Sequence, residues 1–368
     1  MHDFVWRKLV QPFASANLWA RFTAAALFCV LCSGVSGADD GPFLPGPTRV
    51  VSTVLANGDV NPYGVAFVPP SFPAGGKINP GDVLVSNFNA SSNLQGTGTT
   101  IVDVPPNAPV SLFFQGKGLL GLTTALTVLQ KGFVLVGNFP ARKGICENAS
   151  PGSILVIDKN GTMISMITEA VQGPWDSALF DEGNRAKLFV SNALSGAVVR
   201  YDLQVSNSGV FVTKTTQIAS GYLHNCDPVT FVDAPTGLVF DPLKNVLYVA
   251  STADNAVYAV NDAAGRTGDG GTGTLIYTDP KHLHGALGLA MAPNGHLLVT
   301  NNDSINPDPA QPSELVEFTV EGNFVKEISL DPTSGGSFGL AVETHGMTAR
   351  LAAVDDSVNL FVIWTLGD

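Results

Sequence analysis

Short apolar runs alternate with small groups of Gly, Pro, Asn and Asp along most of the chain. A representative segment reads Val246–Ser251 ("VLYVAS"), then the turn "TADN", then Ala256–Val260 ("AVYAV"). Apolar runs of this length bounded by turn-forming residues are typical of β-strands, and no stretch sustains the periodicity of an amphipathic helix. The pattern therefore predicts antiparallel meanders of short strands.

Two phrases recur along the chain and define a repeat. The first is an apolar run that ends in a small residue and an amide, as in "VLVSN", "VLVGN", "LFVSN" and "LLVTN". The second precedes the first and has an equivalent position that is occupied in turn by Gly64, Thr124, Asp176, Gly237, Gly288 and Gly339. Such a repeat, with a period of about 50 to 60 residues, indicates a repeat architecture.

Each repeat contains four short strands, and one such sheet cannot cover both of its own faces. Six units packed face to face around an axis solve this problem, so we expect an all-β, six-bladed β-propeller. The expected blades span about residues 61–116, 119–169, 173–221, 233–279, 284–331 and 336–366. A spare strand at about 48–55 is expected to complete the last blade and close the ring. We expect the innermost strands to carry Gly, Ala, Thr and Ser, because bulky side chains would collide near the axis.

The first 38 residues differ in character from the rest. Arg7, Lys8 and Arg21 precede the apolar run at 22–31, and the small residues Ser36–Ala38 follow it. This order is typical of a secretory signal peptide, whereas a transmembrane anchor would need about 20 apolar residues. We therefore expect an extracytoplasmic protein, periplasmic or secreted, with no stable membrane span after signal cleavage.

Charge and cysteine content narrow the possibilities further. The formal net charge is -12, so a nucleic-acid partner, which needs a basic surface, is not expected. Removal of residues 1–38 takes away Cys29 and Cys32, which leaves Cys146 and Cys226. Two cysteines in an exported protein more often form a disulfide than a redox or metal site, so we predict a bond between them.

The segment "LYVASTADNAVYAV" at 247–260 resembles a unit of the NHL-repeat propellers. The layout of all six units is similar to the superfamily that also holds the gluconolactonase-like and strictosidine-synthase-like propellers. In the gluconolactonase-like branch, the resemblance implies a divalent cation held by a glutamate, two asparagines and an aspartate around the channel. The sequence departs from that pattern, because "NPYGVAF" stands where the glutamate is expected and the one "PNG", at Pro293, falls on the far face.

The repeated amide falls at the end of the second strand of each unit, beside the mouth of the expected channel. Around the ring, this position holds Asn87, Asn138, Asn192, Ser251, Asn301 and Asp355. One interpretation is local, since Asn and Asp cap a following turn by bonding its backbone. The other is functional, with amides and a carboxylate that line a polar pocket for a ligand or a cation. Both interpretations remain open from the sequence.

Residues that break the repeat gather on the same face. Asp176 replaces the repeated glycine, and His224 and His284 lie in loops that enter innermost strands. Further polar residues follow the second strands: Asp254, Asn302, Asp303 and Asp356. Oxygen ligands such as Asp176 and Asp355 would suit calcium, whereas the two histidines would suit zinc. None of these residues forms a local metal-binding motif.

Two functions remain open. The first is a monomeric binding module that presents its mouth loops to a small molecule, a glycan or a protein. The second is a metal-dependent hydrolase or lyase, lactonase-like, with its site at the same mouth. No G-x-S-x-G elbow stands in a strand-turn-helix context, so the sequence offers no motif for nucleophilic catalysis. The predicted ligand-binding residues are Asn87, Asn138, Asp176, Asn192, His224, His284, Asn301 and Asp355.

Overall fold

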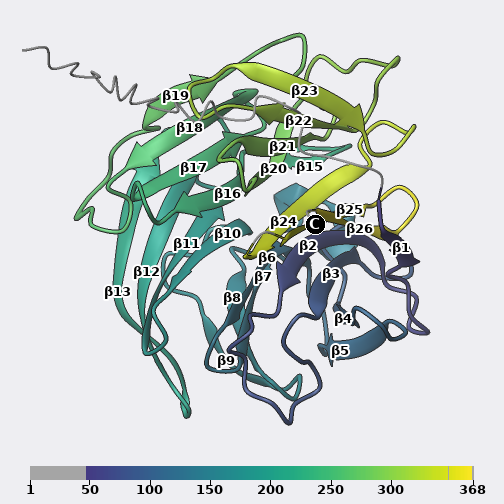
Figure 1. Ribbon diagram of the computed structural model, residues 1–368, viewed down its shortest axis with the longest axis vertical. Coiled ribbons are helices and arrows are strands. Elements are labelled where there is room, and N and C mark those ends of the chain that lie inside the picture. The colour runs from purple at the N-terminus through teal and green to yellow at the C-terminus, as the bar shows by residue number, and fades with distance from the viewer. Residues whose placement is uncertain (1–46, 347, 367–368) are drawn as a thin grey trace, which may run out of the picture. The chain divides into compact units, whose positions relative to one another are not determined.

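A computed structural model describes residues 47–346 and 348–366, and this part of the chain consists almost entirely of β-strands (Figure 1). Its helical elements are two short 3-10 turns, η1 (Arg142–Gly144) and η2 (Cys146–Asn148). Neither turn is long or apolar enough to cross a membrane, and the described residues contain no other helix. The predicted signal peptide at 1–38 lies outside the described residues.

Six four-stranded antiparallel sheets form the blades of a β-propeller (Figure 1). Blade 1 contains β2 (Val60–Phe67), β3 (Val83–Asn89), β4 (Thr100–Val104) and β5 (Ser111–Gln115); blade 2 contains β6 (Leu122–Leu129), β7 (Phe133–Asn138), β8 (Ser153–Asp158) and β9 (Met163–Ile167); blade 3 contains β10 (Pro174–Asp181), β11 (Arg185–Asn192), β12 (Ala197–Ser206) and β13 (Gly209–Ser220). Blade 4 contains β16 (Pro235–Asp241), β17 (Val246–Ser251), β18 (Ala256–Asn261) and β19 (Thr274–Tyr277); blade 5 contains β20 (Ala286–Met291), β21 (Leu297–Asn301), β22 (Glu314–Phe318) and β23 (Phe324–Ser329); blade 6 contains β24 (Ser337–His345), β25 (Thr348–Asp355), β26 (Leu360–Leu366) and β1 (Arg49–Ser52). The predicted all-β, six-bladed architecture is confirmed.

Blade 6 joins the two ends of the propeller. β1 pairs antiparallel with β26, with Arg49 opposite Ile363 and Ser52 opposite Leu360. The innermost strands β2, β6, β10, β16, β20 and β24 each pack against the innermost strands of both neighbouring blades, including β24 against β2. The ring is therefore closed by strand pairing and by packing.

The hydroxyl that precedes the repeated amide links neighbouring blades. Ser86 Oγ accepts a hydrogen bond from Gly64 N (2.9 Å) in its own blade and donates one to Thr123 O (2.8 Å) in the next. Ser191 and Thr300 make the same pair of bonds from blades 3 and 5. All three hydroxyl-bearing residues are fully buried, so each satisfies two backbone groups that water does not reach.

Two other blades supply the same link from the innermost strand. In blade 2 the hydroxyl position is Gly137, and Thr123 Oγ1 instead donates to Pro174 O of blade 3 (2.8 Å). In blade 4, Thr236 Oγ1 donates to Ala286 O of blade 5 (3.2 Å). A Cβ at Gly137 would overlap Thr123 Oγ1. A side chain at position 137 would therefore displace the Thr123 hydroxyl, which makes the link between the blades in this place. The repeated feature is the bond between blades, and the residue that makes it varies.

Large aromatic rings fill the centre of the propeller. They form an aromatic cluster that consists of Tyr63, Phe88, Phe139, Trp175, Phe231 and Phe338. Tyr63 stacks on both Phe88 (4.5 Å between centroids) and Phe338 (4.1 Å), and meets Trp175 edge-on at 5.7 Å. The prediction that innermost strands carry only small residues is therefore wrong, because β2, β10 and β24 contribute three of these rings. Small residues are needed only at the next position, where a Cβ on Gly339 would overlap Tyr63 O.

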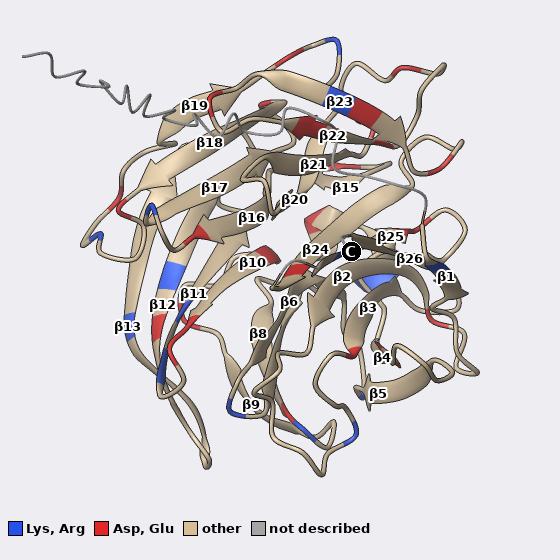
Figure 2. Ribbon diagram, viewed as in Figure 1, with Lys and Arg blue, Asp and Glu red and all other residues tan. Residues whose placement is uncertain are grey.

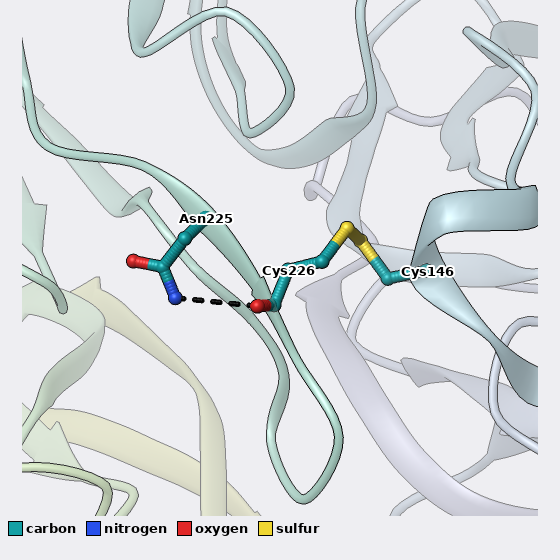
Figure 3. Close-up of a disulfide and its surroundings, with 3 residues drawn as sticks. All are labelled: Cys146, Asn225 and Cys226. Carbon is teal, nitrogen blue, oxygen red and sulfur yellow. Dashed lines mark hydrogen bonds between the residues drawn. A yellow bond between two sulfur atoms is a disulfide. The ribbon is translucent and has the colours of Figure 1, made fainter.

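A hairpin inserted before blade 4 reaches this cluster. Its strands β14 (Asn225–Asp227) and β15 (Phe231–Asp233) pair antiparallel, with Cys226 opposite Val232. Cys226 forms a disulfide with Cys146 of η2, at a Cα–Cα distance of 5.6 Å and a sequence separation of 80 (Figure 3). The predicted disulfide is thus present, and it ties the loop after β7 to the loop before β16.

Candidate functional site

The repeated amides hold the loops that enter the innermost strands. Asn138 Oδ1 accepts from Gly121 N (3.0 Å), and Asn192 Oδ1 accepts from Gln172 N (3.0 Å). Asn301 bridges two loop residues, since its Oδ1 accepts from His284 N and its Nδ2 donates to His282 O. Each amide bonds the loop upstream of its own blade. The local interpretation predicted hydrogen bonds from the amide to the turn that follows it. The observed hydrogen bonds are also structural, but they go to the loop that precedes the blade.

The ring position is less regular in the remaining blades. Asn87 Nδ2 donates to Thr53 O (3.4 Å), which again lies in the segment before the innermost strand, but its Oδ1 has no partner among the described residues. Asp355 Oδ1 accepts from Ser357 Oγ (3.0 Å) downstream. Burial, and then a shared hydrogen bond with Asp331, raise the pKa of Asp355 to about 7.

The other predicted site residues lie apart from one another. Asp176 Oδ2 accepts from Leu238 N (3.0 Å) of blade 4, so this carboxylate sits at a junction between blades. His224 is exposed, with its Nδ1 3.1 Å from Tyr222 O. His284 is buried, and its Nε2 lies 3.2 Å from Lys281 O. The two histidines therefore bond different loops, and among the described residues neither belongs to a group of three His, Cys, Asp or Glu residues that could hold a metal ion.

A cavity of about 710 Å³ opens on the mouth face, and we call it the mouth cavity. Its lining includes Asn61, Tyr63, Asn89, Asn302, Asp303 and Asp356. None of the eight predicted ligand-binding residues lines it. Asn302 and Asp356 directly follow the repeated amide or its aspartate counterpart, and Asp303 lies one position further on. All three were singled out in the sequence as polar residues after the second strands. The volume suits a small molecule.

Several oxygens of this cavity are available as acceptors. Asn61 Oδ1, Gln95 Oε1 and Asp303 Oδ1 are buried and have no hydrogen-bond partner among the described residues. Buried polar atoms are usually satisfied, so these three oxygens need a water molecule or a ligand with hydrogen-bond donors. Asn61 has a left-handed backbone (φ 62°), and its N–H donates to Asn359 Oδ1 (2.6 Å) at the cavity wall. Sequence reasoning missed Asn61 and Gln95, since neither occupies a repeated position.

The electrostatics of the mouth cavity centre on Asp356. Burial, and then the charges of Asp355 and Asp331, raise the pKa of Asp356 well above its usual range. Burial and the charge of Asp356 likewise raise the pKa of Tyr63. The described lining contains three aspartates and neither Lys nor Arg, and Figure 2 shows how sparse basic residues are across the sheets. The cavity thus favours neutral or cationic molecules over anions.

Asp176 and the amides of the ring do not fit the predicted role of calcium ligands. Asp176 directs its two oxygens at Ser177 N (2.7 Å) and Leu238 N (3.0 Å), and the amides of the ring are engaged with backbone loops. The aromatic cluster occupies the axis where a central ion would lie. Among residues 47–346 and 348–366, no group of three or more His, Cys, Asp or Glu residues is placed to hold a metal ion.

Comparisons with known proteins place the fold. No protein-family model and no curated protein sequence matches the chain. Solved structures do: a gluconolactonase from Xanthomonas campestris has a TM-score of 0.53 at 12% identity, with 89% of this chain and 98% of that one covered. A protein from Thermus thermophilus assigned as an oxidoreductase (glucose dehydrogenase) has a TM-score of 0.52 at 14% identity, covering 86% and 99%. A luciferin-regenerating enzyme has a TM-score of 0.51 at 12% identity, covering 88% and 96%. At these identities the likeness shows the six-bladed propeller fold, which confirms the resemblance in fold drawn from the sequence.

Proposed function

We propose that this chain is an extracytoplasmic enzyme that hydrolyses a small neutral or cationic ester or lactone in the mouth cavity. The similar solved structures carry the names of enzymes, which favours this interpretation over the binding module expected first. The disulfide supports an oxidising location outside the cytoplasm. The cation of the lactonase-like alternative is left out, because the residues predicted to hold it do not fit.

The observation that carries the proposal is a titratable carboxyl in a cavity of suitable size. Asp356 lines the mouth cavity, and burial together with the charges of Asp355 and Asp331 raises its pKa well above its usual range, which makes its ionised form a stronger base than an ordinary aspartate. The unpaired acceptors Asn61 Oδ1 and Asp303 Oδ1 are placed to orient hydroxyl or amine groups of a substrate. Tyr63 and Phe338 form an aromatic part of the lining.

In the proposed reaction, ionised Asp356 takes a proton from a water molecule as the water oxygen attacks the carbonyl carbon. The bond between that carbon and the leaving oxygen then breaks, and the proton passes from Asp356 to the leaving oxygen. A carboxylic acid and an alcohol result, joined in one molecule when the substrate is a lactone. Positioned proton transfer of this kind contributes about 100- to 10,000-fold to rate.

The test is turnover of γ-butyrolactone, glucono-δ-lactone and p-nitrophenyl acetate by wild type, Asp356→Asn and Asp254→Asn. Asp254 is a matched control, because it lies on the mouth face, bonds Ser251 and Leu223, and does not line the cavity. We expect Asp356→Asn to lower kcat by at least about 100-fold, Asp254→Asn to retain activity, and EDTA to have no effect. Equal turnover by wild type and Asp356→Asn would contradict the assigned role.

A binding module is the second candidate, and the unpaired cavity acceptors favour it as much as they favour an enzyme. It predicts that polyols or amines raise the melting temperature without being converted. It also predicts that Asp356→Asn leaves the affinity for a neutral polyol unchanged while Asn61→Ala weakens it, because binding of a polyol needs the acceptors and not proton transfer. Thermal-shift titrations with glucose and with choline distinguish the two candidates.

A further inference from the structure

The β14–β15 hairpin is an insertion that forms one wall of the mouth cavity. It lies between the end of β13 at Ser220 and the start of β16 at Pro235. Asp227, Val229 and Thr230 of its turn line the cavity, and Val229 is 77% exposed. The hairpin therefore borders both solvent and the candidate site.

The first residue of β15, which directly follows the turn of the same hairpin, packs in the centre of the propeller. Phe231 is 2% exposed, and its ring lies 5.2 Å from Phe88, 5.4 Å from Phe139 and 6.1 Å from Trp175, between centroids. Its backbone is in the left-handed region (φ 72°), which is unfavourable for a bulky side chain. The surroundings thus hold Phe231 in a conformation that an isolated strand would avoid.

Two attachments restrain the hairpin near its turn. The disulfide joins Cys226 to Cys146, and Gln95 Nε2 donates to Val229 O (2.9 Å). Cys226 is half-buried and Cys146 is 4% exposed, so an external thiol would approach this bond from the side of Cys226. Figure 3 shows that the disulfide reaches across from the hairpin to a separate loop, so its cleavage would remove the covalent restraint on the hairpin without breaking a blade.

We propose that the hairpin is a redox-controlled gate over a second binding pocket, which the aromatic cluster forms once the Phe231 ring withdraws. Exchange with two external thiols converts Cys146 and Cys226 to free thiols, each of which gains a proton, while the external thiols become a disulfide. The freed hairpin relaxes the left-handed Phe231 and opens the mouth cavity to the cluster. This inference does not depend on the hydrolase proposal.

The exposed pocket would take a planar apolar ring that carries a hydrogen-bond acceptor. Phe88, Phe139 and Trp175 would supply the aromatic contacts that Phe231 now makes. Trp175 Nε1 is buried and has no partner among the described residues, so it offers a donor to an incoming acceptor. The bound ring would then occupy the place of the Phe231 side chain.

Trp175 provides a direct reporter of the gate, because it is 1% exposed in contact with Phe231. In a full chain with Trp6→Phe, Trp19→Phe and Trp364→Phe, Trp175 is the single tryptophan. We expect acrylamide quenching of Trp175 to rise several-fold on addition of dithiothreitol. The Cys146→Ser/Cys226→Ser variant in the same background should show the high value with or without dithiothreitol. Equal quenching in the oxidised, reduced and double-serine proteins would overturn the gate.

Binding of 4-hydroxybenzaldehyde, a planar ring with acceptor oxygens, tests the pocket by calorimetry. We expect binding to the reduced wild type and to the double-serine variant, and none to the oxidised wild type. Phe231→Ala keeps the disulfide and removes only the ring, so it should bind the probe even when oxidised. Failure of both the reduced wild type and Phe231→Ala to bind the probe would overturn the pocket. Turnover by Asp356 is measured separately, so the two proposals fail independently.

Discussion

The two ends of the central channel differ in chemistry although the same innermost strands form both. At the mouth, the 710 Å³ cavity is lined by Asn and Asp from loops, including Asn302, Asp303 and Asp356. At the opposite end, a cavity of about 470 Å³ is lined mainly by the innermost strands themselves, with apolar residues such as Leu126 and Leu340 beside polar ones such as Glu343 and His345. Loop residues therefore determine which groups line the mouth cavity, whereas residues of the innermost strands determine which groups line the opposite cavity.

The aromatic cluster separates these two ends. Tyr63, Trp175 and Phe338 come from three innermost strands and meet across the axis, so their side chains fill the passage between the cavities. A polar ligand at the mouth consequently does not reach the opposite cavity. This separation explains how one ring of similar blades can confine a polar ligand to a single face.

Removal of a central ring should have the largest effect on this arrangement. Trp175→Ala deletes a fully buried indole that contacts Tyr63, Phe88 and Phe139, and such deletions cost about 3 to 5 kcal/mol. We expect denaturant unfolding to show a loss in this range. Trp364→Phe serves as the comparison, because it keeps an aromatic ring in blade 6 and should cost clearly less. A small loss for Trp175→Ala would mean that the ends are not divided by packing at the axis.

The sequence predicted the fold because the repeat encodes it directly. Glycines, turn residues and apolar runs recur at equivalent positions in the blades. The last repeat contains three strands in place of four, which predicts the pairing of β1 with β26. The candidate site was harder to predict. The amide recurs at Asn138, Asn192 and Asn301 because it holds the loop that enters each of these blades. The repeated position therefore identified residues that stabilise the fold and not residues of the cavity.

The residues of the mouth cavity lack such a signal. Asp356 follows Asp355 by one position, and only the folded geometry shows that Asp356 lines the cavity while Asp355 bonds Ser357 and Asp331. Asn61 and Gln95 lie within the first repeat but occupy no position that recurs in the other units. Phe231 was equally hidden, because an inserted hairpin carries it to the axis and local sequence cannot specify that contact.

The links between blades should matter next most. Ser191→Ala removes the bonds to Asp176 N and Thr236 O and leaves both backbone groups buried without a partner, at a cost of about 1 to 3 kcal/mol. Ser208→Ala, on the exposed β12–β13 turn, is the matched control and should leave the free energy of unfolding nearly unchanged. Equal midpoints of urea unfolding for the two variants would argue that the repeated hydroxyl has no structural role.

Asp176 should make the stability depend on pH. Burial is the main cause that raises its pKa to about 7, against hydrogen bonds from Leu238 N and Ser177 N that lower it. An unfolded aspartate titrates near about 3.9, so between the two values the folded protein retains a proton that the unfolded chain has lost. Stability therefore falls as pH rises through this window, by at most about 1.4 kcal/mol per pH unit from this group.

Asp176→Asn removes this titration, so we expect a flatter dependence of urea unfolding on pH between about 4 and 7 than in wild type. Asp103 and Asp355, whose pKa values burial also raises to about 7, remain in the variant and keep part of the slope. A slope for Asp176→Asn equal to that of wild type would mean that this carboxyl titrates normally in the folded ring.

The smallest effect is expected at the opposite end. Val342 lines the opposite cavity on β24 and is only half-buried, so Val342→Thr introduces a hydroxyl there at a cost of about 0.5 kcal/mol or less. Because the aromatic cluster lies between this position and Asp356, turnover of the lactones should be unchanged in kcat and in KM. A change in KM alone would show that substrate extends past the cluster. The aromatic cluster would then separate the two cavities only while no substrate is bound.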